Sequence, residues 1–266
     1  MADWFFCDAG FGFEFPYNLW GGILLVVGCI VFSLFGNRRC LRSMTAIGFT
    51  LVWMAVLAVF LVAEGIGGWK LYHTWGGILL WLVFLFHLGL VILRRLRKWN
   101  LRNALFFLNH TGIWLVVAAT FLGAPDVKRV KMLLPLGQVE NRALDENGYI
   151  HSLFFRVLLQ KFQVEYFNDD RSAPKNFRAE LLLQSPNETK RVELDVNKPV
   201  RFEGYAFYIE GYDQQLGSAS EYVTLQLVRD PWEHIVYWGI LMMLAGSVGL
   251  IIYGPIRRKR DERDLE

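Results

Sequence analysis

The sequence has few cysteines and none of the cysteine motifs that carry thiol redox chemistry or covalent haem attachment. Cys7, Cys29 and Cys40 are the three cysteines among 266 residues. There is no CxxC and no CxxCH segment, which excludes a thioredoxin-like thiol carrier and a c-type cytochrome. The topology predicted below separates the three thiols outside, within and inside the membrane. We therefore expect no disulfide framework.

Basic residues are missing from the first 18 positions, which instead carry Asp3, Asp8 and Glu14. A secretory signal peptide has a basic start and a small-residue cleavage site, so we do not expect one here. The formal net charge of +3 is modest. The basic residues gather beside apolar runs, which suits membrane orientation better than nucleic-acid binding.

Apolar residues are abundant: they make up 54% of the chain, and the mean hydropathy is +0.28. They are concentrated in runs long enough to span a hydrocarbon core, which takes about 20 residues. We predict transmembrane helices at 19–36, 44–63, 71–93, 104–123 and 235–254. Only the fourth run contains a conspicuous polar pair, Asn109-His110.

The basic residues of the connecting segments predict the orientation of these helices. Lys and Arg concentrate in cytoplasmic loops. Residues 37–43, 94–102 and 257–260 are basic, and a count of five helices places all three segments on one side. The acidic N-terminus and the stretch 125–231 fall on the opposite side. We therefore expect the N-terminus and a large domain outside the cytoplasm, with the C-terminal tail inside.

The pattern changes to short strands between the fourth and fifth helices. Apolar and aromatic segments at 155–167, 177–184, 191–196, 205–211 and 222–229 are separated by turn residues. We predict a compact, antiparallel, sandwich-like β domain at 125–231, between a four-helix region at 1–124 and a last helix and tail at 232–266. The domain has no cysteine, and His151 is its one clear histidine. A role in binding or positioning is favoured over catalysis.

Two histidines lie inside predicted helices at similar depth. His110 is about six residues from the cytoplasmic end of its helix, or roughly 9–10 Å deep, and His87 lies at about the same depth in the preceding helix. An ionisable side chain within a membrane usually faces a partner or a cavity, and neutral imidazole is a good iron ligand. The two could sandwich a haem. Residues that share the His110 face and could line the ring are Phe106, Ile113, Trp114 and Val117.

Each of these features has an ordinary structural alternative. A histidine within a membrane can hydrogen-bond to a neighbouring helix, and an aromatic stripe is usually packing or lipid contact. His73 and His234 fall at helix ends near the membrane–water interface. Aromatic and water-exposed polar side chains are common there, so these two histidines require no functional explanation.

Several further segments occur in a fixed order over residues 50–255. They are Glu64-Gly65 followed by Leu71-Tyr72-His73-Thr74-Trp75; Asn109-His110-Thr111-Gly112 with Leu122-Gly123-Ala124; Ala173-Pro174-Lys175-Asn176-Phe177-Arg178-Ala179; Val196-Asn197-Lys198-Pro199, Glu203-Gly204-Tyr205 and Gly211-Tyr212-Asp213; and Val228-Arg229-Asp230-Pro231 before Val236-Tyr237-Trp238-Gly239. In this order they resemble the ResB (CcsB) family of System II cytochrome c biogenesis.

The resemblance implies a function and a place for it. ResB proteins act in the bacterial cytoplasmic (inner) membrane with a CcsA-type partner, and together they carry haem outward and attach it to apocytochrome c. A histidine in the helix before the outer domain is an axial ligand of a b-type haem, and the second ligand comes from CcsA. The matching residue here is His110. The chain would be an accessory subunit of a haem lyase rather than the catalytic one.

The sequence departs from the family pattern in three respects. Residues 19–36 add a helix before the usual four. His87 stands where many relatives have a polar residue that is not a ligand. The chain also has no Trp-rich haem-handling loop, so a separate chain would have to supply it. The alternatives are a haem b membrane anchor for electron transfer through His87 and His110, and a structural or sensory membrane protein without haem.

Overall fold

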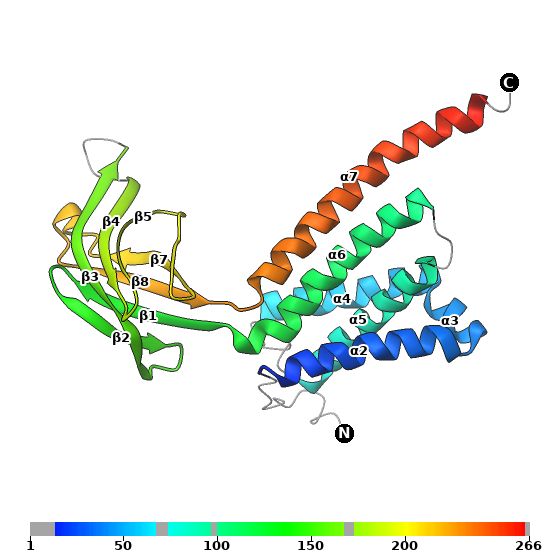
Figure 1. The fold of residues 1–266 in the computed structure, drawn as a ribbon, viewed down its shortest axis with the longest axis horizontal. Coiled ribbons are helices and arrows are strands. Elements are labelled where there is room, and N and C mark those ends of the chain that lie inside the picture. Colours follow the sequence, from blue (N-terminus) through cyan, green and yellow to red (C-terminus); the bar gives the residue numbers. More distant parts are fainter. Residues whose placement is uncertain (1–13, 68–73, 97–99, 168–172, 264–266) are drawn as a thin grey trace. The chain divides into compact units, whose positions relative to one another are not determined.

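The computed structural model describes residues 14–67, 74–96, 100–167 and 173–263, without the side chains of residues 254–263. Cys7 and His73, which entered the sequence predictions, lie outside the described residues, as do Arg97 and Lys98 of the basic segment 94–102. The chain divides into two compact units, one of residues 1–126 and 231–266 and the other of residues 127–230. Each unit is described separately (Figure 1).

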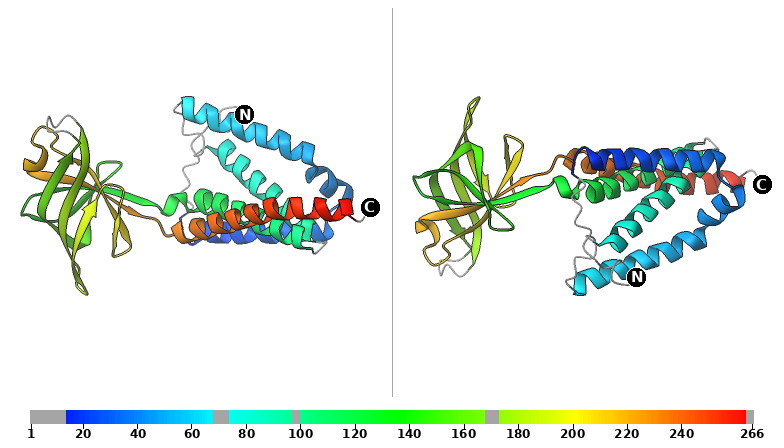
Figure 2. Two further views of the ribbon diagram at one scale, coloured as in Figure 1. Left: turned by 90° about the horizontal axis from the view of Figure 1, so that it is seen from above. Right: turned by 90° about the horizontal axis from the view of Figure 1, so that it is seen from below.

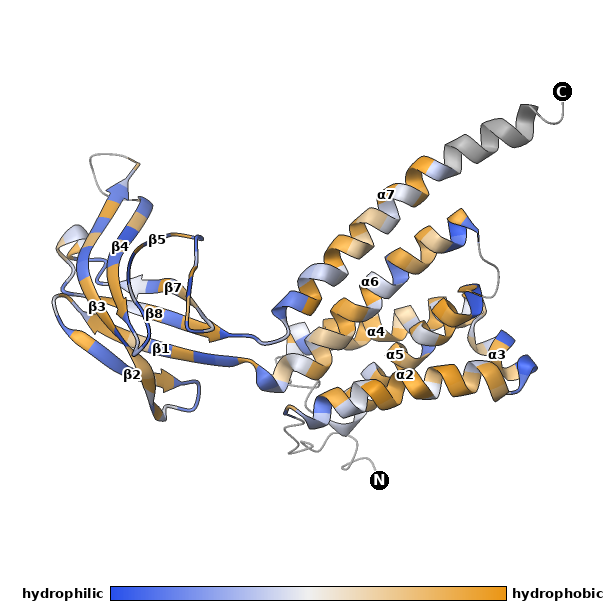
Figure 3. Ribbon diagram, in the orientation of Figure 1, coloured by the Kyte–Doolittle hydropathy of each residue, from blue (hydrophilic) through white to orange (hydrophobic). Residues whose placement is uncertain are grey.

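The first unit is helical. Its helices are α2 (Tyr17–Phe35), α3 (Arg38–Met44), α4 (Ile47–Gly67), α5 (Trp75–Leu96), α6 (Leu101–Gly123) and α7 (Glu233–Arg263), with a single 3-10 turn, η2 (Ala124–Asp126), after α6. Within the described residues, five of these helices are long and apolar enough to cross a membrane. Their apolar character is visible along their length in Figure 3. The predicted number of spans is confirmed, and the chain is a multi-pass membrane protein.

Helices α6 and α7 pack closely because glycines remove the side chains between them. A Cβ atom added to Gly112 would lie 2.5 Å from the backbone oxygen of Gly239 and 2.5 Å from the backbone nitrogen of Met243. Gly239 in turn faces Val116, and Gly249 faces Leu105. Helices within a bilayer usually associate through close backbone approach at small residues, because hydrophobic burial does not favour the association of helices that lipid already surrounds.

Asp126 joins three helix ends at the end of this unit from which the polypeptide continues into the β unit. Its carboxylate accepts hydrogen bonds from the backbone N–H of Phe15 at 2.8 Å, from Asn18 Nδ2 at 2.7 Å and from Trp232 Nε1 at 2.6 Å. Asn18 also donates to the backbone oxygen of Leu122 at 2.9 Å. The carboxylate therefore ties the start of α2 and the segment before α7 to the end of α6.

Helix α4 makes little contact with the rest of the helical unit. Leu57 is its one buried residue among those described, and Figure 2 shows α4 diverging from α6 and α7 along its length. It meets α5 near its own start, where Thr50 contacts His87 and the guanidinium of Arg94 bonds to Thr45. Most of the α4 surface is therefore available to lipid or to another protein.

The second unit is one antiparallel sheet. Its strands are β1 (Lys128–Pro135), β2 (Val139–Asp145), β3 (Ile150–Tyr166), β4 (Pro174–Gln184), β5 (Thr189–Asp195), β6 (Val200–Phe202), β7 (Tyr205–Tyr212) and β8 (Tyr222–Arg229). They lie in the order β5-β4-β3-β2-β1-β8-β7-β6. The predicted antiparallel β domain is confirmed, and its strands form a single continuous sheet.

The sheet encloses one hydrophobic core. Alternate residues of β1 and β8 are buried, as expected for strands with one covered face: Val130, Met132, Leu134, Val223, Leu225 and Leu227. Phe155 of β3 is fully buried and contacts the rings of Phe202, Tyr205 and Phe207 on β6 and β7. Strands from both ends of the sheet therefore share the same core, because the sheet curls around it.

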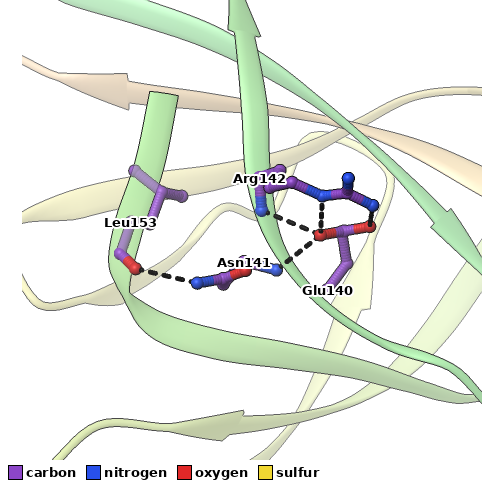
Figure 4. A network of polar contacts seen from close by, with 4 residues as sticks. All are labelled: Glu140, Asn141, Arg142 and Leu153. Atoms are coloured by element: carbon purple, nitrogen blue, oxygen red, sulfur yellow. Dashed lines mark hydrogen bonds and ion pairs between the residues drawn. The ribbon is translucent and has the colours of Figure 1, made fainter. Parts of the chain in front are cut away.

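An irregularity in β2 is stabilised by its own polar side chains (Figure 4). The pairing of β2 with β3 shifts register between Glu140 and Arg142. Glu140 accepts hydrogen bonds from the backbone N–H groups of Asn141 and Arg142 and from the Arg142 guanidinium, each at about 3.0 Å. Asn141 Nδ2 donates to the backbone oxygen of Leu153 at 3.4 Å. The side chains thus satisfy groups that the bulge takes out of the ladder.

Candidate functional site

The polar pair Asn109-His110 lies in α6, and its two side chains have different neighbours. Asn109 is buried and donates from Nδ2 to the backbone oxygen of Met243 at 2.9 Å and to Ser247 Oγ at 2.6 Å, both in α7. Consecutive helical residues point about 100° apart. With Asn109 bonded to α7, the next side chain is directed to another side of α6.

His110 is held within α6 by its own helix. Its Nδ1 lies 3.1 Å from the backbone oxygen of Phe106, and its ring stacks on the Phe106 ring with centroids 3.6 Å apart. A carbonyl oxygen can only accept, so Nδ1 carries the proton in this hydrogen bond. In a neutral imidazole Nε2 then has the lone pair. Within the described residues, His110 makes no other hydrogen bond.

The guanidinium of Arg95 lies against the ring of Phe106, the residue that stacks on His110. The guanidinium carbon of Arg95, at the end of α5, is 4.5 Å from the centroid of Phe106, and its Nε donates to Asn103 Oδ1 at 3.2 Å. Phe106 is therefore in contact with both the Arg95 guanidinium and the His110 imidazole. Sequence reasoning missed Arg95, because it was counted only among the basic residues that set the orientation.

The donor set around His110 suits a metal bound at Nε2. A histidine ligand usually donates its other ring N–H to a carbonyl or carboxylate, which fixes the tautomer and makes the ligating nitrogen more basic. The Phe106 carbonyl provides that acceptor here. Among the described residues no group of three or more His, Cys, Asp or Glu side chains could hold a metal ion. His110 could hold the iron of a haem as a single axial ligand.

His87 has different contacts. It is buried in α5, its Nε2 lies 3.1 Å from Thr50 Oγ1, and its ring centroid lies 5.3 Å from that of Phe49. Both neighbours belong to α4. Its Nδ1 is buried and has no hydrogen-bond partner within the described part of the chain. No contact in the described structure joins His87 to His110, and their pairing stays a prediction.

Of the other residues predicted to line a ring, Trp114 has a defined structural partner. Its Nε1 donates to the backbone oxygen of Leu85 at 3.0 Å, which links α6 to α5. Trp114 also lines an apolar groove of about 290 Å³ between α2, α6 and the start of α7. Ile113 and Val117 are half-buried. In the β unit, Nε2 of the exposed His151 lies 2.8 Å from the carboxylate of the half-buried Asp145, and this contact lowers the pKa of Asp145.

Comparison with known proteins supports the resemblance read from the motifs. Residues 97–220 match the model of the ResB-like family. The cytochrome c biogenesis protein CcsB of Synechococcus sp. (strain CC9605) is 28% identical over 122 residues, which cover 46% of this chain and 26% of that protein. The predicted resemblance to the ResB/CcsB family is confirmed by these matches, which lie within part of the chain.

These similarities are partial. The chain spans about a quarter of the length of the curated relative that it matches. Among solved structures, a cytochrome c haem lyase, CcmF, aligns with 88% of this chain and 40% of its own, at 15% identity and a TM-score of 0.40.

Proposed function

We propose that this protein is the membrane subunit of a System II cytochrome c synthase that helps to carry haem across the membrane and to present it to apocytochrome c. The match of residues 97–220 to the ResB-like family model and the name of the Synechococcus relative support a role in cytochrome c biogenesis. A CcsA-type partner would supply the remaining haem-handling surface. In this assignment the chain is an accessory subunit of the haem lyase.

The observation that carries the proposal is the hydrogen bonding of the two ring nitrogens of His110. The Phe106 carbonyl occupies Nδ1, and Nε2 has no hydrogen bond within the described residues. Nε2 is therefore available to one axial position of a b-type haem. Bound iron would supply redox chemistry whose potential depends on its axial ligands. The side chains contribute an oriented imidazole, the apolar ring of Phe106 and the nearby cation of Arg95, which favours the anionic propionates of the cargo.

The second ligand is assigned to the partner. His87 has its Nε2 within hydrogen-bonding distance of Thr50 and packs against α4, whereas His110 contacts Phe106 of its own helix, α6. A ligand from a CcsA-type chain would also explain why one histidine of this chain suffices. In this proposal the protein lies in the bacterial cytoplasmic membrane, and the basic loops support an orientation with the N-terminus and the β unit outside.

The test is an absorption spectrum of the full chain purified with and without a CcsA-type partner. We expect haem in the complex only, with loss of the bis-histidine spectrum in His110→Gly and its return when imidazole is added. The matched control is His87→Asn, which we expect to keep the spectrum of the complex.

Three outcomes would contradict the proposal. Haem bound by the chain alone and lost in either histidine variant would support the di-histidine membrane anchor instead. Absence of haem in both preparations would favour a structural role. A spectrum that survives His110→Gly without imidazole would remove His110 from the site.

A further inference from the structure

The hairpin that joins β2 to β3 presents an unusual group of exposed apolar side chains. Leu144, Tyr149, Ile150 and Phe154 are 44%, 69%, 66% and 59% exposed. Leu144 and Ile150 are directly paired across the two strands, so their side chains lie on the same face. The neighbouring Ala143 is 2% exposed and faces the core. Exposed apolar groups of this kind mark contact with a membrane or another protein.

The strand register puts this hairpin at the end of the sheet where the chain enters and leaves. β1 pairs with β8 from Lys128 opposite Arg229 onward, so both connections to the membrane helices are at that end. Asp145, the last residue of β2, pairs with Val130 near the start of β1. The turn between β2 and β3 therefore lies beside the two connections (Figure 1).

Chain length limits how far the hairpin can be from the bilayer. Helix α6 has 23 residues, or about 34 Å, which matches the roughly 30 Å of hydrocarbon and puts its end at the interface. Val130 follows Asp126 by four residues, so it lies at most about 14 Å from it. A cross-strand neighbour adds about 5 Å. Asp145, where the hairpin turn begins, is therefore within about 20 Å of Asp126 at the end of the membrane segment.

The chemistry of this end of the sheet suits a lipid headgroup region. Tyr149 stands at the turn, and tyrosine is enriched where membrane meets water because its ring is apolar and its hydroxyl is polar. Lys128, Arg129 and Arg229 are exposed at the same end of the sheet. Such cations favour the phosphate groups of lipids. By the strand register these cations lie level with the hairpin turn, and Arg129 is 3.9 Å from the Glu146 carboxylate of the turn, so apolar and cationic side chains occur together at this end of the sheet.

We infer that the β2–β3 hairpin inserts its apolar tip into the interface of the leaflet from which the β unit emerges. The occupant of the surface formed by Leu144, Tyr149, Ile150 and Phe154 is thus the bilayer itself. The inference needs only the strand register, the exposures and the membrane helices, and is independent of haem.

The experiment is nitroxide depth measurement on the full chain, with one copy per nanodisc containing zwitterionic and anionic phospholipid. The native cysteines Cys7, Cys29 and Cys40 are replaced by Ala, and single labels are placed by Tyr149→Cys, Ser152→Cys and Val139→Cys. Val139 is the matched control, because it is 58% exposed and lies at the opposite end of β2. Unchanged circular dichroism of each variant shows that the strands are intact.

At Tyr149 and Ser152 we expect relaxation by oxygen to rise and relaxation by a water-soluble nickel complex to fall relative to Val139. Adding Ile150→Asp should return the label at Tyr149 to the values of Val139. Equal depth at Tyr149 and Val139 would overturn the inference. Low accessibility to both reagents would overturn it as well, because it indicates burial against protein rather than lipid.

Discussion

The glycine contact between α6 and α7 gives a quantitative prediction for Gly112→Ala. The added Cβ would lie 2.5 Å from two backbone atoms of α7, against 3.4–4 Å for ordinary van der Waals contact. Backbone atoms cannot rotate away, so the helices must separate by about 1 Å, at an overpacking cost of about 1–3 kcal/mol. The shift also strains the hydrogen bond from Asn109 to Met243, and such a bond in a membrane protein contributes about 0.6–1.7 kcal/mol.

One effect opposes this cost. Alanine is a better helix former than glycine by about 1 kcal/mol. We therefore expect a net destabilisation of about 1–3 kcal/mol. The assay is equilibrium unfolding of the full chain in dodecyl maltoside with an increasing fraction of dodecyl sulfate, followed by tryptophan fluorescence.

The matched control is Gly48→Ala in α4, where an added Cβ meets nothing within 4 Å. It should be neutral or stabilising by up to about 1 kcal/mol. If Gly112→Ala unfolds at the same dodecyl sulfate fraction as Gly48→Ala, the close approach of α6 and α7 is not as described. A Gly112→Ala variant that keeps its midpoint but loses haem in the complex would also refute the packing argument.

Two further predictions concern carboxylates outside the membrane helices. The Arg142 guanidinium lowers the pKa of Glu140 to about 2. Because the pKa is lower in the folded than in the unfolded state, the ionised carboxylate stabilises the β unit above about pH 4. This stabilisation is lost as the pH falls through about 2. Glu140→Gln should therefore lower the thermal midpoint measured by circular dichroism at pH 7, and the difference should shrink below pH 4. Glu188→Gln, at an exposed residue, is the control. Equal midpoints for the two variants at pH 7 would contradict the prediction. Asp126→Ala removes a charged acceptor of three hydrogen bonds, each worth about 1.5–3 kcal/mol, so amide exchange at the start of α2, next to Asn18, should accelerate about tenfold or more; unchanged exchange there would mean that Asp126 does not hold α2.

The helices were predictable because a bilayer imposes simple rules on them. A spanning segment must satisfy its own backbone hydrogen bonds and exclude charge, so length and hydropathy suffice to count spans. The short helix α3 was missed within the predicted first loop. It depends on Asn37, whose side chain accepts a hydrogen bond from the Arg39 N–H, and on burial of Leu41. The seven residues of α3 include three arginines, so they show no helical repeat of apolar residues from which the helix could have been predicted.

The sequence predicted that the β unit is an antiparallel β domain, but it did not predict the order of the strands in the sheet. Strands with clear alternation were identified from the sequence, whereas β1, β2 and the three-residue β6 were not. The sequence of β1 begins with charged residues, and its pairing with β8 joins positions about a hundred residues apart. Only this long-range pairing shows that the chain enters and leaves the sheet at one end, which is the basis for placing the β2–β3 hairpin near the membrane.

The similar depth of the two histidines stays a prediction from the helical rise, and their directions depend on neighbours that the sequence does not name. His87 is directed to α4 by Thr50 and Phe49. The direction of His110 follows from Asn109, because the hydrogen bonds of Asn109 to α7 set the rotation of α6 about its axis. The adjacent polar residues of α6 thus have separate roles. Asn109 fixes the rotation of the helix, and Phe106 then orients the His110 imidazole through its backbone oxygen and its ring.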